Sequence, residues 1–433
     1  MRITHFFTSK LAHITKKHYL CSVYIYNPHR MTDIIQYIIT FLLYGDENAA
    51  SLVGYTNDQT QWPNYRVVIV PNGHLGKEIV MPELQEAKGE RRKAKGEEQA
   101  PWIIKTDIIY NTFFFISRAE EVINPQRDEH GRFLAKHSIL GQQNRLMIPL
   151  VDEYSRMLMK LLDLPLPAPS FSHIYLTHDV DTIAHYRHTR GAIGGILRGQ
   201  WRKVLASWRD IHNDPAFTFP WLIEQDKQVP NAQIVYFIKD TFGKDYDYPQ
   251  YDLYGDDYNV VEELIENSGA KIGIHASYYG TLATAVELYG YLINSSEYKT
   301  NPQLYHRGHY LNCPIDQMQR WTNLLVTDDF TMMFPDQVGF RLQTTRPVRW
   351  INPTTMQLTK LVLHPMAIMD CTLSNTNYMN LNEDEAYFEC QRLLEKIHQN
   401  AGEVVLLWHN TIVSNDGYHR SLYPKLLSLL KCE

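Results

Sequence analysis

The sequence predicts an α/β protein whose main domain is a β/α barrel or a wound parallel sheet. Two observations support this class. First, short apolar runs typical of buried strands recur through the second half of the chain, with helical or loop segments between them. Second, most of these runs end at or near an ionisable residue, which indicates one shared rim of strand ends and argues against a sandwich. The predicted strands cover residues 174–177, 233–238, 271–275, 324–327, 338–342, 360–363 and 404–408, and the residues expected at the rim are Asp179, Lys239, His275, Asp328, Arg341, His364 and His409.

An N-terminal α/β domain of unknown role is predicted over residues 31–165. Its predicted elements are a helix over 32–43, strands over 65–70 and 111–118, and a helix over 154–162. The proline-rich segment 165–169 is expected to separate this domain from the barrel, which covers 170–433. Residues 1–30 are interpreted as an extension ahead of the functional chain, because Met31 opens a better amphipathic helix.

Composition narrows the class of function. The chain has 433 residues and a formal net charge of −6, so it has no global basic field that would hold nucleic acid. Its five cysteines are scattered and lack the paired spacings of zinc ribbons or disulfide frameworks, which is typical of reduced cytosolic thiols. No apolar run approaches the roughly 20 residues that span a bilayer. These features predict a cytoplasmic protein with neither a membrane span nor a nucleic-acid partner.

The segment His-Ile-Tyr-Leu-Thr-His-Asp-Val-Asp, residues 173–181, carries the clearest chemical signal. It is a short apolar strand that ends in two carboxylates, Asp179 and Asp181. Residues two apart point to the same side of an extended strand, so both carboxylates can face one ion or one water. The pattern indicates a metal ligand or a general base, and the alternative is that one aspartate only caps the following helix.

Three further segments bring histidine or arginine to the same predicted rim. The strand Lys-Ile-Gly-Ile-His ends at His275, where a neutral imidazole can bind zinc or simply be a satisfied polar residue. In His-Arg-Gly-His-Tyr, Arg307 can orient a carboxylate, and His309 can be a ligand, a proton donor or a packed core residue. The apolar strand before His409 insulates it from water, which suits an acid that works near neutral pH.

These motifs, in this order, resemble the polysaccharide deacetylase family of carbohydrate esterases. The likeness covers residues 172 to about 425 and rests on Thr-x-Asp, Gly-x-His, Arg-x-x-Tyr, an Asp-containing strand and a final strand ending in His. It is closer for the bacterial branch with Thr-His-Asp-Val-Asp first and Trp-His-Asn last, preceded by an uncharacterised N-terminal domain. The resemblance implies a distorted (β/α)7 barrel with one divalent metal, commonly zinc, held by an aspartate and two histidines.

The resemblance also implies roles for individual residues. Asp179 matches the base that activates the metal water, Arg307 the arginine that orients this base, and His409 the acid that protonates the leaving amine. Two positions depart from the family pattern, because the second aspartate would fall on Val180 and the second histidine on Tyr279. The predicted metal ligands are therefore Asp181, His275 and His309, with His178 as the alternative to His309.

The insertion between the first two barrel strands mixes basic and apolar residues. A solvated amphipathic helix is the plain interpretation, and an anion-binding lid beside the site is the sharper one. The residues concerned are Arg187, His188, Arg190, Ile193, Ile196, Leu197, Arg198, Trp201, Arg202, Lys203, Trp208 and Arg209.

The resulting hypothesis is a metal-dependent hydrolase that removes the acetyl group from an N-acetylated sugar in envelope or capsule glycan synthesis. The substrate would be a glycan or a sugar on a pyrophosphate-linked carrier. The rival enzyme is a hydrolase of a non-sugar amide or ester. The rival from another class is a non-catalytic carbohydrate-binding or assembly protein, for which Val180 and Tyr279 are the support.

Overall fold

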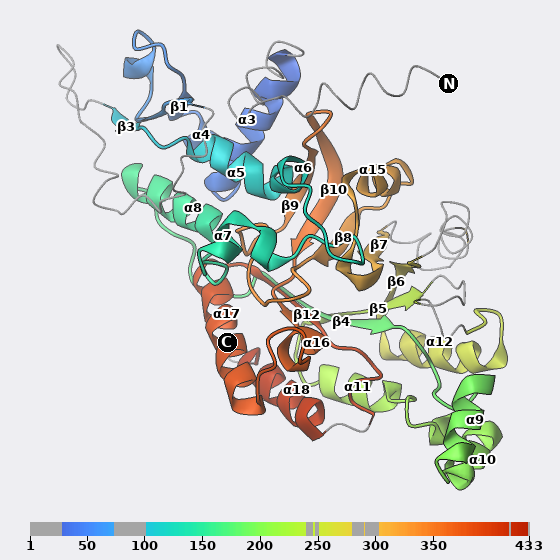
Figure 1. Cartoon of the computed structure of the whole chain (residues 1–433). Helices are drawn as coiled ribbons and strands as arrows, with labels where there is room; N and C mark the ends of the chain where they lie inside the picture. Colours follow the sequence, from blue (N-terminus) through green and yellow to red (C-terminus); the bar gives the residue numbers. More distant parts are fainter. Residues whose placement is uncertain are drawn as a thin grey trace, which may run out of the picture.

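The computed structural model describes residues 28–72, 101–239, 246, 251–278, 290, 303–414 and 417–431. The chain forms a mixed α/β structure in which a small three-stranded sheet with its helices lies beside a large nine-stranded sheet (Figure 1). The predicted extension over 1–30 lies outside the described residues, apart from the first turn of a helix that begins at Pro28.

The N-terminal part contains a parallel sheet with the order β1 (Val53–Tyr55), β2 (Val67–Ile69), β3 (Trp102–Ile104). Helices α3 (Pro28–Leu42) and α8 (Leu150–Leu161) confirm the two predicted helices, and β2 confirms the predicted strand over 65–70. The shorter helices of this part are α4 (Glu47–Ala50), α6 (Ala119–Ile123), α7 (Ile139–Gln142), η1 (Trp62–Asn64) and η2 (Ala135–His137).

The predicted strand over 111–118 is wrong, because this segment belongs to helix α5 (Ile108–Ile116). Asp107 caps the helix by accepting a hydrogen bond from the backbone N–H of Tyr110 at 2.9 Å. All nine residues of α5 are buried. A helix that is apolar on every side has no periodic pattern to distinguish it from a buried strand.

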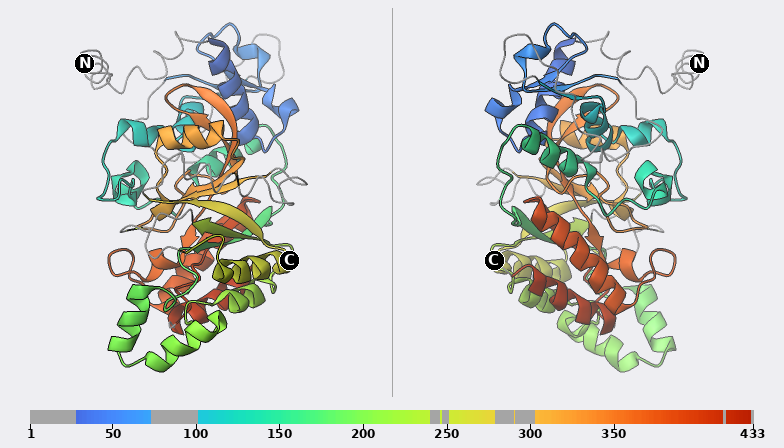
Figure 2. Two further views of the ribbon diagram at one scale, coloured as in Figure 1. Left: turned by 90° about the vertical axis from the view of Figure 1, so that its right-hand side faces the viewer. Right: turned by 90° about the vertical axis from the view of Figure 1, so that its left-hand side faces the viewer.

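The large sheet has the strand order β11–β12–β4–β5–β6–β7–β8–β10–β9, and its paired strands run parallel except β9 with β10. The sheet curls into a half-barrel with β11 and β9 at its edges, which confirms the α/β class (Figures 1 and 2). Its strands are β4 (His173–Val180), β5 (Gln233–Lys239), β6 (Lys271–Ala276), β7 (Tyr305–Gly308), β8 (Asp328–Met332), β9 (Val348–Asn352), β10 (Gln357–Pro365), β11 (Ile368–Met369) and β12 (Glu403–Leu407).

Five predicted strands are confirmed as β4, β5, β6, β10 and β12, and two are wrong. Residues 324–327 form a turn after a helix, where Leu325 has a φ of 65°, and β8 begins only at Asp328. Residues 338–342 are buried outside any strand, and Gly339 has a φ of 136° that interrupts an extended chain. Apolar character indicated burial correctly at 338–342 but did not fix the backbone conformation.

Helices cover the large sheet from outside. Helix α12 packs on β6, α17 packs on β12, and α11 and α18 contact each other beside them (Figure 1). No helix among the described residues has the length and apolar character needed to cross a lipid bilayer. The helices of this part are α9 (Thr189–Leu197), α10 (Trp201–Arg209), η3 (Ile211–Asn213), α11 (Phe219–Asp226), α12 (Asp256–Ser268), η5 (His309–Leu311), α15 (Ile315–Asn323), α16 (Asp370–Ser374), α17 (Glu383–Gln399) and α18 (Gly417–Leu429).

One apolar core joins the N-terminal part to the large sheet. It includes Phe114 of α5 and Trp350 of β9 in a single buried cluster. Buried Glu121 adds an ionic link, because it accepts a hydrogen bond from Arg341 at 2.6 Å. Residues 164–172, which contain the predicted boundary, form neither helix nor strand.

Candidate functional site

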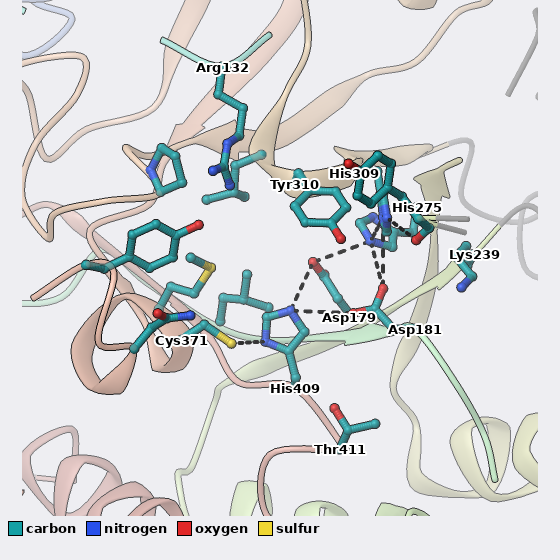
Figure 3. A pocket seen from close by; sticks show the side chains of 17 residues that line it. Arg132, Asp179, Asp181, Lys239, His275, His309, Tyr310, Cys371, His409 and Thr411 are labelled. Atoms are coloured by element: carbon teal, nitrogen blue, oxygen red, sulfur yellow. Dashed lines mark hydrogen bonds and ion pairs between the residues drawn. The ribbon is translucent and has the colours of Figure 1, made fainter. Parts of the chain in front are cut away.

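A cavity of about 320 Å3 opens where the C-terminal ends of β4, β5, β6, β7 and β12 meet (Figure 3). Five of the six predicted site residues line this cavity: Asp179, Asp181, His275, His309 and His409. The sixth, Arg307, is fully buried and contacts Asp179 from behind. The structure therefore brings together all six residues that the sequence indicated.

Asp179 near the end of β4 and Asp181, just beyond this strand, both face the cavity, whereas the residues next to Asp179 face the other side of the sheet. Side chains alternate along a strand, so Asp179 and Asp181 share a side that His178 and Val180 do not reach. Val180 is fully buried in an apolar cluster. His178 is also buried, and its ring nitrogens contact a backbone carbonyl at 2.7 Å and the Asp226 carboxylate at 2.9 Å. His178 is thus not placed to replace His309 as a ligand.

The residues Asp181, His275 and His309, here called the rim cluster, could hold a metal ion. Nδ1 of His275 lies 3.2 Å from the carbonyl oxygen of Arg307, and Nε2 of His309 lies 3.3 Å from that of Tyr246. A carbonyl oxygen only accepts, so each of these outer nitrogens carries the proton. The inner nitrogens, Nε2 of His275 and Nδ1 of His309, face each other. A neutral ring with its proton on the outer nitrogen is the tautomer that binds metals.

The donor atoms of the rim cluster have spacings suited to a small cation. Nε2 of His275 lies 3.0 Å from Nδ1 of His309, and these nitrogens lie 3.4 Å and 3.9 Å from Oδ1 of Asp181. A tetrahedral zinc site with bonds near 2.1 Å separates its ligand atoms by about 3.4 Å. Oδ1 of Asp181 is buried and has no hydrogen-bond partner among the described residues. A cation bound between the three atoms would give this oxygen a partner.

Asp181 is held in its anionic form. Burial alone would raise the pKa of this carboxyl, but His275, and then His409 and His309, lower it well below its usual value. An ionised carboxylate is the form that binds a metal.

Arg307 fixes the orientation of Asp179. Its Nη1 donates to Oδ1 of Asp179 at 2.8 Å, its Nη2 donates to Thr177 at 2.9 Å, and its Nε donates to the carbonyl of Phe330 at 3.1 Å. The guanidinium also lies 4.4 Å above the ring of Phe237. The other carboxylate oxygen, Oδ2, lies 3.8 Å from His275 and lines the cavity side. Asp179 is thus positioned as a proton acceptor beside the rim cluster.

His409 faces the cavity from the end of β12 and has an acidic partner that sequence reasoning missed. Its Nδ1 lies 2.8 Å from Oδ1 of buried Asp370, and its Nε2 lies 3.9 Å from Asp179. Burial by itself would lower the pKa of His409, but the Asp370 carboxylate raises it well above its usual value. The Asp370 carboxylate therefore favours the protonated imidazole, which can donate from Nε2 into the cavity.

Three residues expected at the rim lie elsewhere, so that part of the prediction is wrong. Asp328 and His364 join Glu403 in what is here called the base cluster, inside the half-barrel. Asp328 begins β8 and Glu403 begins β12, so this cluster lies at the opposite end of the strands from the cavity. Arg341 pairs with Glu121 of α6 instead. The strand expected to deliver Asp328 is a turn, which moved the residue to the start of the true strand.

Another group, His306, Cys313 and Asp329, also has metal-type donor atoms near one another. Nδ1 of His306 lies 2.6 Å from Oδ2 of Asp329, and all three residues are buried away from the cavity. Burial raises the pKa of the Cys313 thiol well above its usual value, so the thiolate that metals require is disfavoured. Of these two groups, the rim cluster is the better metal site.

Arg132 brings the N-terminal part into the cavity wall. It follows the polar turn after α6, where no sequence motif marks it, and its Nε donates to Asp128 at 2.8 Å. Its guanidinium lies 5.7 Å from the ring centre of Tyr310 and 5.8 Å from that of Tyr378, which also line the cavity (Figure 3). Lys239 at the end of β5 is the other cationic side chain among the described lining residues.

The basic insertion is not a lid over this cavity, because no residue of α9 or α10 is among the described lining residues. The arginine and lysine among the described lining residues are Arg132 and Lys239 instead. Tyr279, the position of the missing family histidine, lies outside the described residues.

Comparison with known proteins gives one match. Residues 11–167 match the model of a family of unknown function (DUF7033), so the likeness covers the N-terminal part and ends within the proline-rich segment. No curated protein and no solved structure matches the chain. The N-terminal part of this chain is thus similar to a family whose function is itself unknown.

Proposed function

We propose that the cavity is the active site of a metal-dependent hydrolase that removes the acetyl group from an N-acetylated sugar. One observation supports this proposal most strongly. The rim cluster with its three metal donors, the oriented carboxylate of Asp179 and the imidazole of His409, whose pKa is raised, all line one cavity. When bound, a divalent cation such as zinc would lower the pKa of a water molecule and polarise the amide carbonyl.

The residues of the chain divide the proton transfers of amide hydrolysis between them. Asp179 accepts a proton from the attacking water at Oδ2, because Arg307 occupies Oδ1. The water oxygen bonds to the carbonyl carbon, and the carbon–nitrogen bond breaks as Nε2 of His409 donates its proton to the leaving amine. Asp370 holds His409 through Nδ1, so that Nε2 faces the cavity. The products are acetate and a free amino sugar.

The choice of an N-acetylated sugar rests on the resemblance to polysaccharide deacetylases. The same resemblance supports the proposal that the half-barrel belongs to a distorted (β/α)7 barrel. Tyr310 and Tyr378 offer the cavity aromatic faces on which a sugar ring can stack. Arg132 and Lys239 suit a substrate with an anionic carrier such as a pyrophosphate. The unpaired thiols among the described cysteines support a cytoplasmic location.

Metal content and acetate release from the purified full chain test the proposal together. We expect one equivalent of divalent metal by elemental analysis and acetate release from N-acetylglucosamine oligosaccharides. Chelation should abolish this release, and added Zn²⁺ should restore it. Asp179→Asn should keep the metal and lose turnover, whereas Asp163→Asn, at an exposed ion pair with Arg66, should keep both.

Two outcomes would overturn this function. A chain that takes up no divalent metal even from excess Zn²⁺ favours the non-catalytic carbohydrate-binding protein. A metal-loaded chain that cleaves simple esters or other amides but releases no acetate from N-acetylated sugars belongs to the rival class of hydrolase.

A further inference from the structure

Helices α9 and α10 form a hairpin that projects from the far end of the molecule. Figures 1 and 2 show it in bright green, remote from α3 and the small sheet. The hairpin follows β4 by eight residues, and a three-residue connection, 198–200, joins its helices. It contributes no described residue to the cavity wall, so its surface calls for a separate explanation.

The hairpin packs small residues inside and exposes large apolar ones. The helices meet at Gly195 and Val204, and a Cβ on Gly195 would lie 2.6 Å from the Val204 side chain. The outward side chains are each at least half exposed, whereas a soluble amphipathic helix buries such residues. They are Ile193 (54%), Ile196 (54%), Leu197 (81%), Trp201 (50%), Leu205 (50%) and Trp208 (55%).

The same segment is strongly basic. Residues 182–209 contain no aspartate or glutamate, and one of their cations, Arg187, is paired with Asp257 at 2.7 Å. A positive field therefore surrounds the exposed apolar face, although the whole chain carries a net charge of −6. The basic residues of the segment are Arg187, Arg190, Arg198, Arg202, Lys203 and Arg209.

Buried polar contacts hold the hairpin in this arrangement. Asp214 accepts hydrogen bonds from the backbone of Tyr186 at 2.9 Å and from the hydroxyl of Ser207 at 2.7 Å. The indole of Trp208 donates to the carbonyl of Tyr186 at 2.9 Å, and the Tyr186 hydroxyl donates to Gln200. The exposed face is thus fixed before any partner binds, which limits the entropy lost on binding.

We propose that the α9–α10 hairpin docks the protein on an anionic phospholipid membrane. Tryptophan and aliphatic side chains enter the boundary between headgroups and acyl chains, and adjacent arginine and lysine bind anionic headgroups. A nucleic acid would pair with the cations but would leave Ile193, Ile196 and Leu197 exposed to water. The inference does not depend on the proposed hydrolase activity.

Vesicle flotation of the full chain tests the docking surface. We expect binding to vesicles of 30% phosphatidylglycerol in phosphatidylcholine and much weaker binding to phosphatidylcholine alone. The triple variant Leu197→Ser, Trp201→Ser, Trp208→Ser should lose at least about tenfold in partitioning. The variant Arg198→Gln, Arg202→Gln, Lys203→Gln should lose about fivefold for each cation removed, with the effect shrinking at high salt.

Controls use exposed residues elsewhere, Phe388→Ser for apolar character and Arg320→Gln for charge, and both should bind like the native chain. Equal thermal unfolding midpoints would show that the hairpin variants remain folded. The proposal is overturned if the native chain does not float with anionic vesicles, or if both triple variants float as well as the controls. If the native chain self-associates but binds no vesicles, and the apolar variant does not self-associate, the exposed face instead binds a second copy of the chain.

Discussion

Two histidine and carboxylate clusters in the same half-barrel have opposite states of hydrogen bonding. In the base cluster, Nδ1 of His364 lies 2.9 Å from Glu403 and Nε2 lies 2.9 Å from Asp328, so both ring nitrogens have anionic partners. In the rim cluster, the outer nitrogens of His275 and His309 face carbonyls while their inner nitrogens face each other. Only the rim cluster opens on the cavity.

The contrast between the two clusters shows which feature identifies a functional site. Both clusters combine histidine with aspartate or glutamate behind apolar strands, so residue type does not separate them. The base cluster satisfies its own atoms and stabilises the fold, whereas the rim cluster leaves Oδ1 of Asp181 without a hydrogen bond among the described residues. A buried carboxylate oxygen without a hydrogen bond, beside converging imidazole nitrogens at a cavity, indicates chemistry, whereas a closed ion-paired triad indicates structure.

The largest expected effect separates the clusters by metal content. His309→Ala should weaken Zn²⁺ binding by more than about a hundredfold, because outer-shell contacts alone are worth about 10- to 100-fold. Asp328→Asn in the base cluster should retain the full equivalent. Elemental analysis after dialysis against trace metal measures both. A full equivalent of zinc in the His309 variant would place the third ligand elsewhere and erase the distinction between the clusters.

The second effect concerns stability. Burial would lower the pKa of His364, but Glu403 and Asp328 raise it to about 9. Because folding raises this pKa, the protonated imidazole adds up to roughly 3 kcal/mol to the free energy of unfolding. This contribution is complete below about pH 6.5 and is lost as the pH rises to about 9. The free energy of unfolding, measured with denaturant, should be lower at pH 9.5 than at pH 6. This difference should be smaller in the His364→Gln variant. The same pH slope in native and variant chains would contradict the ionic character of the base cluster.

The third effect tests the partner of His409. Asp370→Asn removes the charge that raises the pKa of His409, so the imidazole should lose its proton at a lower pH. The high-pH limb of the kcat profile should move toward neutrality, and at a pH above both limbs acetate release should fall about tenfold for each unit by which the pKa drops. Metal held by the rim cluster should not change, because Asp370 is not one of its three residues. An unmoved limb would mean that another group donates the proton.

The smallest effect concerns substrate charge. Arg132 already pairs with Asp128, so its net contribution to an anionic substrate is about 1 kcal/mol, or about fivefold in KM. Arg132→Gln should raise KM for a phosphorylated N-acetylated sugar and leave a neutral one unchanged. Arg127→Gln, at a nearby arginine outside the described cavity wall, is the matched control. Equal changes for both substrates would exclude charge recognition by Arg132.

Local sequence patterns were sufficient to predict several parts of the site. Apolar runs with the correct length predicted β4, β5, β6, β10 and β12, and the two-residue period of a strand placed Asp179 and Asp181 on one face. Parallel strands align their C-terminal ends, so the sequence also indicated that His275 and His409 would approach these carboxylates. These inferences needed only the alternation of side chains and the rule for parallel sheets.

The remaining residues of the site are brought to it by tertiary contacts between segments that are distant in the sequence. Asp370 meets His409 because β11 pairs with β12, and Arg132 reaches the cavity because the N-terminal part packs on the large sheet through a shared core. Neither contact leaves a local pattern in the sequence. Helix α5 was predicted as a strand because an element buried on all sides lacks the hydrophobic periodicity that appears when one face is exposed to water.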